Sequence, residues 1–172
     1  MKENNKIKMV RVKKEEFDSF KNRAKISFIK GLEGAFPEHS QPEKIAPIPS
    51  EEDYDESFKS KDSETYYLWL NEENIGGVIL NINKETHRNE VDVLYIDSKA
   101  VGKGIGTKVW DTIEKHYPET KVWELHTPYF EKRNIHFYIN KCKFSITGFY
   151  KEVFKIDGQD KEIEFFKFEK FM

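Results

Sequence analysis

Three apolar runs joined by very short connections limit the folds open to this chain more than any other feature. The runs cover residues 65–70, 76–83 and 90–96, and turn-forming residues separate them, Asn-Glu-Glu-Asn with two glycines first and Asn-Lys-Glu-Thr-His-Arg-Asn second. Runs this long with such turn chemistry are typical of strands. A parallel connection needs a dozen residues or more, so these strands must pair antiparallel. The sequence therefore predicts a three-stranded meander.

The elements around the meander are predicted from the same signals. Before it come a strand over 7–14, a helix over 15–34, a proline-rich loop over 35–50 and a short acidic helix over 50–61 that Ser50 caps. After it come a helix over 104–117, a strand over 121–127, a helix over 130–142 and a closing hairpin over 144–171 that turns near 156–160. This order predicts a mixed α/β fold, unlike the regular alternation of a doubly wound sheet.

Size and charge narrow the class of protein. A chain of 172 residues suits one core, so residues 1–172 are predicted to form a single domain. The net charge of −2 argues against a nucleic acid or an anionic membrane as the main partner. No stretch approaches the roughly 18 apolar residues of a membrane span, and the single cysteine, Cys142, suits a reducing compartment. We therefore expect a cytoplasmic protein with a small ligand, and Cys142 as an inert packing thiol.

A glycine-rich segment, KAVGKGIGTKVW over 99–110, lies between the last strand of the meander and a helix. It does not match a Walker loop, because Gly104 follows Lys103 where serine or threonine is required. It does not match the dinucleotide fingerprint either, because residue 107 is threonine. Backbone amides gathered at the helix start can still bind an anion. The simpler alternative is a tight turn between strand and helix.

The surroundings of this loop carry a family resemblance. The segment LYIDSKAVGKGIGTKVWDTIE resembles the acetyl-CoA-binding motif of the GNAT superfamily of N-acetyltransferases, and NIHFYINKCKF resembles its second motif, about thirty residues later. The resemblance extends over essentially the whole chain. It implies an α/β (α+β) fold, with a mixed, mostly antiparallel sheet of about six to seven strands and about four flanking helices, the GNAT-like acyl-CoA N-acyltransferase fold.

The same resemblance implies an activity and a set of site residues. It implies transfer of an acetyl group from acetyl-CoA to a primary amine of a small molecule or peptide, by direct attack in a ternary complex. The pantetheine arm would pair with Tyr95 and Ile96, and Asn134 is a further candidate for cofactor binding. The pyrophosphate would be held by backbone amides of Val101, Gly102, Lys103, Gly104, Ile105, Gly106 and Thr107.

The catalytic candidates follow from the second motif and the neighbouring strand. Tyr138 corresponds to the tyrosine that protonates the leaving thiolate, although the stretch from Tyr138 to Phe144 is one residue longer than usual and strict counting selects Ile139. Glu124 and His126 lie two residues apart on one face of a strand, so either is a candidate base. Glu90 and Asp92 are weaker candidates.

Other departures leave alternatives open. Val101 replaces the usual glutamine or arginine and Lys143 replaces a glycine, so a catalytically inactive acyl-CoA-binding protein is the main alternative. The third hypothesis, after the acetyltransferase and the inactive binding protein, is an unrelated nucleotide-binding enzyme. The histidines are scattered without ligand spacing, so no metal site is predicted. The acidic run EEDYDES either attracts a cationic amine or forms a solvated helix face, and the aromatic hairpin is either a homodimer seam or a core edge.

Overall fold

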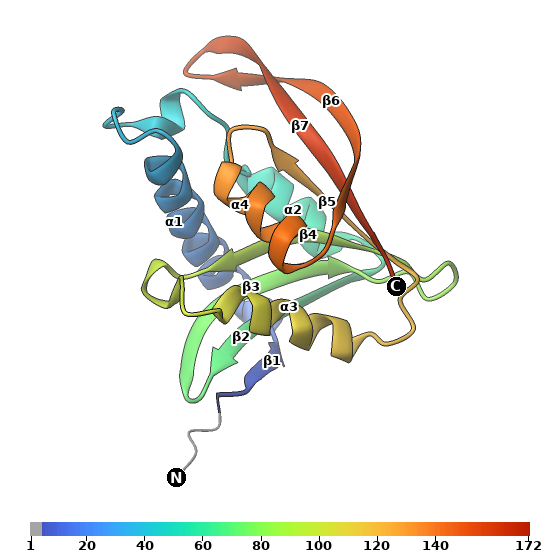
Figure 1. Cartoon of the computed structure of the whole chain (residues 1–172). Coiled ribbons are helices and arrows are strands. Elements are labelled where there is room, and N and C mark those ends of the chain that lie inside the picture. Colours follow the sequence, from blue (N-terminus) through green and yellow to red (C-terminus); the bar gives the residue numbers. More distant parts are fainter. Residues whose placement is uncertain (1–4) are drawn as a thin grey trace.

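The computed structural model describes residues 5–172 as a seven-stranded sheet with helices on both faces (Figure 1). The strands are β1 (Ile7–Arg11), β2 (Ser63–Leu70), β3 (Glu73–Asn81), β4 (Arg88–Ile96), β5 (Val122–Pro128), β6 (Ser145–Ile156) and β7 (Gln159–Phe171). The helices are α1 (Phe17–Ala35), α2 (Glu51–Lys59), α3 (Ile105–His116) and α4 (Lys132–His136), and a π-helical turn, Phe137–Lys141, continues α4. The predicted element order is confirmed.

The sheet has the order β1-β2-β3-β4-β5-β7-β6, and every neighbouring pair is antiparallel except β4 and β5. The predicted meander is β2, β3 and β4, and the predicted closing hairpin is β6 and β7. The fold is therefore the mixed, mostly antiparallel α/β arrangement that the sequence predicts.

The only parallel pair of the sheet formed by residues 5–172 is also its weakest joint. Strands β4 and β5 pair only through Arg88–Glu90 with Val122–Glu124, and then diverge. Opposite β3, the register of β4 moves from Val93 to Val91, so Asp92 forms a bulge. Beyond the joint, the rest of β4 has no partner on its β5 side among the described strands.

Two aromatic clusters hold the helices to the two faces of the sheet. Trp110 of α3 packs edge to face on Trp123 of β5, with ring centroids 5.4 Å apart. On the other face, Phe20 of α1 packs on Tyr95 of β4 at 5.3 Å. Full burial of side chains of this size stabilises a fold by roughly 1.5–3 kcal/mol each. The two clusters therefore fix the helix positions that shape the site.

Helix α2 begins where the sequence predicts. The Asp53 amide donates to Ser50 Oγ at 3.1 Å, and the Ser50 amide donates to Asp53 Oδ2 at 2.7 Å. This reciprocal capping box satisfies two amides that a helix start leaves free. It fixes the start of a helix whose next turns line the candidate site.

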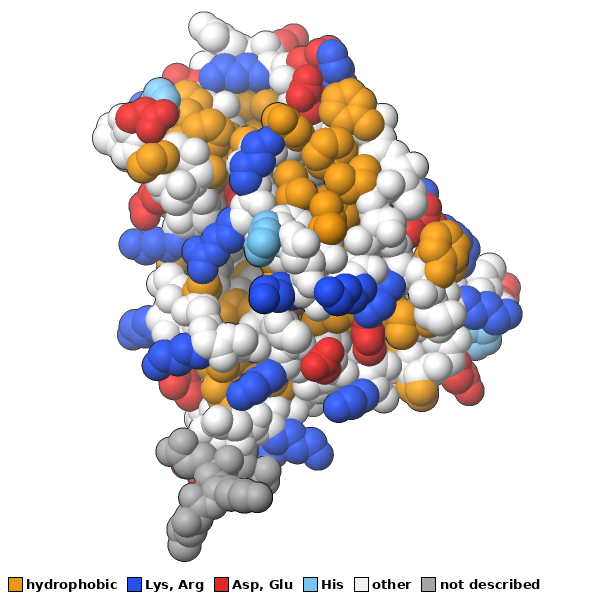
Figure 2. All heavy atoms as spheres, viewed as in Figure 1, with side chains coloured by type: hydrophobic (Ala, Val, Ile, Leu, Met, Phe, Trp, Pro, Cys, Tyr) orange, Lys and Arg blue, Asp and Glu red, His pale blue; other side chains and the backbone are white. Residues whose placement is uncertain are grey.

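The outer face of the β6–β7 hairpin exposes apolar side chains, including Ile146, Phe149 and Val153. Figure 2 shows them as an orange patch, with basic side chains gathered below it over α3 and α4. A homodimer seam at this hairpin stays a prediction. None of the helices described between residues 5 and 172 has the length and apolarity needed to cross a bilayer.

Candidate active site

The glycine loop places three consecutive residues in the left-handed backbone region. The φ angles are 98° at Gly102, 55° at Lys103 and 73° at Gly104, and Gly104 caps α3. A Cβ added at Gly102 or Gly104 would have no heavy atom within 4 Å, so the space beside these glycines is open. Glycine adopts this conformation without steric cost, whereas most residues do not. The need for a left-handed backbone, and not a lack of space for a side chain, therefore explains why Gly102 and Gly104 are glycines.

The loop leaves several amides free to bind an anion. Inside it, the Ile105 amide donates to Gly102 O and the Lys108 amide to Gly104 O, both at 3.2 Å. Six other amides have no carbonyl acceptor in the described backbone, namely those of Val101, Gly102, Lys103, Gly104, Gly106 and Thr107. Val101 is in extended conformation and is half exposed. Unpaired amides at the start of a helix are the donors that an anion site requires.

The free edge of β4 presents backbone toward β5. Tyr95 pairs with Gly77 of β3, its carbonyl lies close to Gly76, and its buried ring packs against α1. Backbone groups of successive strand residues point to opposite edges, so Ile96 directs its own toward the open edge. The Ile96 carbonyl accepts a hydrogen bond from Ser27 Oγ at 2.8 Å. Of the two backbone groups of Ile96, the amide is therefore the one available to a ligand. Of the predicted pair, Ile96 has the backbone suited to a ligand.

The π turn absorbs the extra residue between Tyr138 and Phe144. The Cys142 amide donates to Phe137 O at 3.1 Å, five residues back, so the helix widens by one residue. Lys143 then takes φ 67°, the left-handed conformation that the family gives to a glycine. Tyr138 is 8 % exposed and lines a groove, whereas Ile139 packs beside the core. The structure therefore directs Tyr138, and not Ile139, into the groove.

This groove has a volume of about 570 Å³. Its walls come from α1, the proline-rich loop, α2, β4, β5, α4 and the β6–β7 hairpin. Predicted residues Asn134, Tyr138 and His126 line it. Five carboxylates also line it, Asp53, Glu56, Asp92, Glu131 and Glu152. Volume and mixed lining are typical of a small-molecule site.

The two predicted base candidates lie together, but only one lines the groove. His126 Nε2 lies 3.1 Å from Glu124 Oε1, and His126 Nδ1 lies 3.1 Å from the Tyr150 hydroxyl. Glu124 also lies 3.4 Å from both Arg88 and Lys167, so its charge is compensated by basic groups from two other strands. Glu124 does not line the groove, whereas His126 does.

Glu131 also lines the groove, and it is not among the site residues predicted from the sequence. It occupies the N-cap position of α4 without a side-chain capping bond, and one of its carboxylate oxygens lies 3.8 Å from the position that a Cβ of Gly31 would take. Burial raises the pKa of its carboxyl above 4.5. Burial also raises the pKa of Tyr138, and the charges of Cys142 and Glu131 raise it further. One sequence signal could have identified Glu131 as a site residue: it lies seven residues before Tyr138, at a position where the family often has asparagine.

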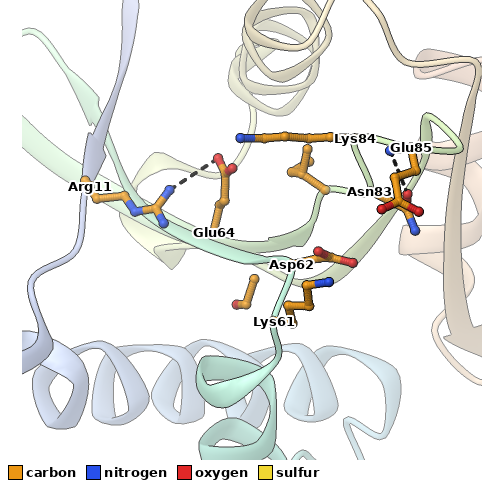
Figure 3. A pocket seen from close by; sticks show the side chains of 9 residues that line it. Arg11, Lys61, Asp62, Glu64, Asn83, Lys84 and Glu85 are labelled. Atoms are coloured by element: carbon orange, nitrogen blue, oxygen red, sulfur yellow. Dashed lines mark hydrogen bonds and ion pairs between the residues drawn. The ribbon is translucent and has the colours of Figure 1, made fainter.

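A second hollow lies at the ends of β2 and β3 and differs in charge (Figure 3). Three basic residues, Arg11, Lys61 and Lys84, face three acidic ones, Asp62, Glu64 and Glu85, and Arg11 pairs with Glu64 at 3.2 Å. Its charges are therefore balanced. Across residues 5–172, no group of three or more histidine, cysteine or acidic side chains is arranged to hold a metal ion.

Comparison with known proteins gives consistent results. A model of the acetyltransferase (GNAT) family matches residues 31–144. An uncharacterized protein of Bacillus subtilis (strain 168), YrkN, is 45 % identical over 106 residues, which are 62 % of this chain and 57 % of YrkN. The match thus spans little more than half of that relative.

Solved structures of low sequence identity share the fold. Spermidine N-acetyltransferase from Vibrio cholerae, in complex with CoA and spermine, has a TM-score of 0.68 at 18 % identity, with 98 % of this chain and 96 % of that chain covered. A Bacillus subtilis acetyltransferase in complex with CoA has a TM-score of 0.60 at 18 % identity, with 97 % and 98 % covered. With a family match over most of its length and this fold, the chain belongs to the acetyltransferase (GNAT) family.

Proposed function

We propose that this protein transfers an acetyl group from acetyl-CoA to a primary amine of a small molecule or peptide. One observation carries the proposal: the glycine loop and the segment bearing Tyr138 are in contact. A Cβ on Gly106 would lie 2.8 Å from the ring of Phe137, the neighbour of Tyr138. An anion site and a groove-facing hydroxyl are thereby fixed relative to one another, as transfer from a phosphate-bearing donor requires.

The residues present fit coenzyme A. Free amides at the start of α3 would bind the pyrophosphate, and open space beside Gly102 and Gly104 admits it. Val101 offers no side-chain donor, so this binding rests on the backbone, with Lys103 and Lys108 as auxiliary charges. The open edge of β4 at Ile96 offers an amide to the pantetheine arm or the thioester oxygen. The structures of similar fold that contain CoA support this assignment.

The donor supplies an acetyl thioester, and the chain's own groups handle the protons. The amine nitrogen forms a bond to the thioester carbonyl carbon, the carbon–sulfur bond breaks, and the sulfur leaves as a thiolate. Tyr138 donates its proton to that thiolate. Burial raises the pKa of Tyr138, so the hydroxyl is fully protonated at neutral pH and gives up its proton only to a strong base such as the newly formed thiolate. Asn134, one helical turn earlier, lines the same groove and would position the donor.

We assign the amine's proton to His126 Nδ1, through the Tyr150 hydroxyl that lies 3.1 Å from it or through a water that takes the place of that hydroxyl. His126 lines the groove, and Glu124 holds the Nε2 side of its ring. Of the two predicted bases, Glu124 fits an orienting role because Arg88 and Lys167 already compensate its charge. This arrangement parallels other sites in which a carboxylate orients a histidine.

Release of the coenzyme A thiol, measured with acetyl-CoA and a panel of amines, tests the function. Thiol release that depends on an amine, together with an acetylated product in mass spectra, supports it. Thermal stabilisation by acetyl-CoA without thiol release from any amine supports the inactive acyl-CoA-binding protein instead. Stabilisation by ATP or NAD but not by coenzyme A would exclude both.

A further inference from the structure

We propose that the acceptor is an extended aliphatic amine carrying at least two positive charges and no anionic group. The inference rests on the proposed function and specifies its substrate class. It starts from the charge of the groove that contains Tyr138. Five carboxylates line this groove, and no lysine or arginine from residues 5–172 does.

None of these five carboxylates takes part in an ion pair within the described chain. Thirteen ion pairs form between residues 5 and 172, and Asp53, Glu56, Asp92, Glu131 and Glu152 are in none of them. Like charges gathered around a partly enclosed space repel one another and disfavour burial. Four of them, all but Glu131, are exposed to solvent, and a cation bound among the five would relieve their repulsion.

Helix α2 separates its acidic residues by face. Glu51 and Asp55, four residues apart, both pair with Lys21 of α1, at 3.1 Å each. Asp53 and Glu56, three residues apart, line the groove, and Ser57 of the same helix donates to Asp92 Oδ2 at 2.6 Å. The two faces of the helix therefore differ: Lys21 partly compensates the charge of one face, while the other face joins Asp92 of β4 in a wall without a basic partner.

Polar atoms without partners point to a ligand independently of the carboxylates. Tyr54 and Asn81 line the groove, and neither Tyr54 Oη nor Asn81 Oδ1 has a hydrogen-bond partner among the described residues. Tyr54 is 2 % exposed. Buried polar atoms are normally paired, so unpaired ones need an explanation. Both oxygens can accept hydrogen bonds, which is what an ammonium group supplies.

Aromatic side chains complete the lining and define the middle of the ligand. Phe28, Phe130, Phe154 and Phe165 line the groove among the acidic residues. Methylene groups pack on such rings, and aromatic faces attract cations. Glu131 lies at the Tyr138 end, while Asp53, Glu56 and Asp92 belong to the α2–β4 wall. A chain of methylenes with charge at both ends fits this lining: the reacting amine would lie at the Tyr138 end, within reach of His126 as the proposed base, and the second charge would lie at the α2–β4 wall.

Three acceptors of matched length test the inference in the thiol-release assay. They are 1,4-diaminobutane, n-butylamine, which lacks the second charge, and 4-aminobutanoate, which reverses it. Loss of one charge-assisted interaction should lower kcat/KM about 10- to 100-fold from the diamine to butylamine. The aminobutanoate should be poorer still. Equal kcat/KM for the diamine and butylamine would overturn the inference and leave the acetyltransferase activity in place.

Variants locate the second charge. Glu56→Gln combined with Asp92→Asn should raise the KM for the diamine about tenfold or more, with the KM for acetyl-CoA and for butylamine unchanged. Glu52→Gln is a control on the same helix, because Glu52 is exposed and does not line the groove. A double variant that affects butylamine as strongly as the diamine would show that the wall does not bind a second charge.

Failure of the proposed function can be distinguished experimentally from failure of this inference. If no amine releases thiol, calorimetry of 1,4-diaminobutane with the coenzyme-A-loaded protein decides the inference separately. Binding that the double variant weakens and the Glu52→Gln control keeps supports a diamine site without turnover. No binding would overturn the inference together with the function.

Discussion

Gly106 of α3 lies directly against the ring of Phe137, so that any Cβ at Gly106 would come 2.8 Å from Phe137 Cε2. The third glycine of the loop thus serves close packing, whereas Gly102 and Gly104 serve a left-handed backbone. The contact also transmits the position of the loop to the turn that carries Tyr138. The glycine loop and the turn that carries Tyr138 are therefore in direct contact.

Gly106→Ala tests this contact. The added methyl group must displace the Phe137 ring, so we expect a loss of about 1–3 kcal/mol in unfolding free energy and a lower kcat. The matched control is Gly34→Ala in α1, where a Cβ meets nothing within 4 Å and should add about 0.5–1 kcal/mol. Urea unfolding of both variants measures these two changes in unfolding free energy, a decrease for Gly106→Ala and an increase for Gly34→Ala. A stabilised Gly106→Ala would refute the packing role.

Gly104→Val tests the anion loop. Both Gly104 and Gly158 have positive φ, 73° and 75°, with open space beside them, so valine at either should cost about 1–2 kcal/mol of stability. Only Gly104→Val should also raise the Kd for coenzyme A, by about 10- to 100-fold, because its amides no longer converge. Calorimetric titration of the two variants compares them. Full affinity in Gly104→Val would place the pyrophosphate elsewhere.

Tyr138→Phe removes one hydroxyl and keeps the ring that packs on Phe144 and Phe168. We expect kcat to fall about 10²- to 10⁴-fold, while Tm and the KM for acetyl-CoA stay near wild type. Steady-state kinetics with acetyl-CoA and the best amine measure the effect, with Tyr129→Phe, an exposed residue, as control. An unchanged kcat would leave Tyr138 only a packing role.

Glu131→Gln should stabilise the free protein while impairing amine binding. Burial raises the folded-state pKa of Glu131 above 4.5, so deprotonation costs more in the folded than in the unfolded chain. That destabilisation is absent well below pH 4.5, develops as pH rises from the ordinary pKa, and is complete only above the raised one. The variant's Tm should therefore exceed that of wild type at pH 7, and the difference should vanish at pH values well below 4.5. A constant difference across this range would point to another cause.

Cys142 should be unreactive in the folded protein. It is 1 % exposed, and burial raises the pKa of its thiol to about 12. The thiolate is the reactive form, so a disulfide reagent such as DTNB should modify no thiol at pH 8 until the chain unfolds. The native protein would then add no background to a thiol-release assay. Rapid modification of the native protein would contradict the predicted inert role.

Local signals explain most of what the sequence predicts correctly. Short connections allow only antiparallel pairing in β2, β3 and β4, and the Ser50 capping box marks the start of α2. The hairpin around Gly158 follows from alternation about a turn. Each of these elements depends on residues close in sequence, so their signals are complete in one segment.

The site's finer features depend on residues far apart in sequence. The π turn appears in the sequence only as an irregular spacing before Phe144, and the hydrogen bond from Cys142 to Phe137 explains it. The charge compensation of Glu124 comes from Arg88 and Lys167, on strands 36 and 43 residues away, so the choice between Glu124 and His126 needed the assembled sheet. The groove's lack of basic residues is likewise a property of surfaces, not of a motif.

The short pairing of β4 with β5 has a consequence for the mechanics of the sheet. Strands β1 to β4 and strands β5 to β7 form two half-sheets, joined edge to edge through three residue pairs. A ligand hydrogen-bonded along the open edge would act as the missing rungs of that ladder and lock the two halves together. Amide hydrogen exchange would then slow on both sides of the gap, far beyond the atoms that the ligand touches, and the cosubstrate would be part of the architecture on which its own reaction depends.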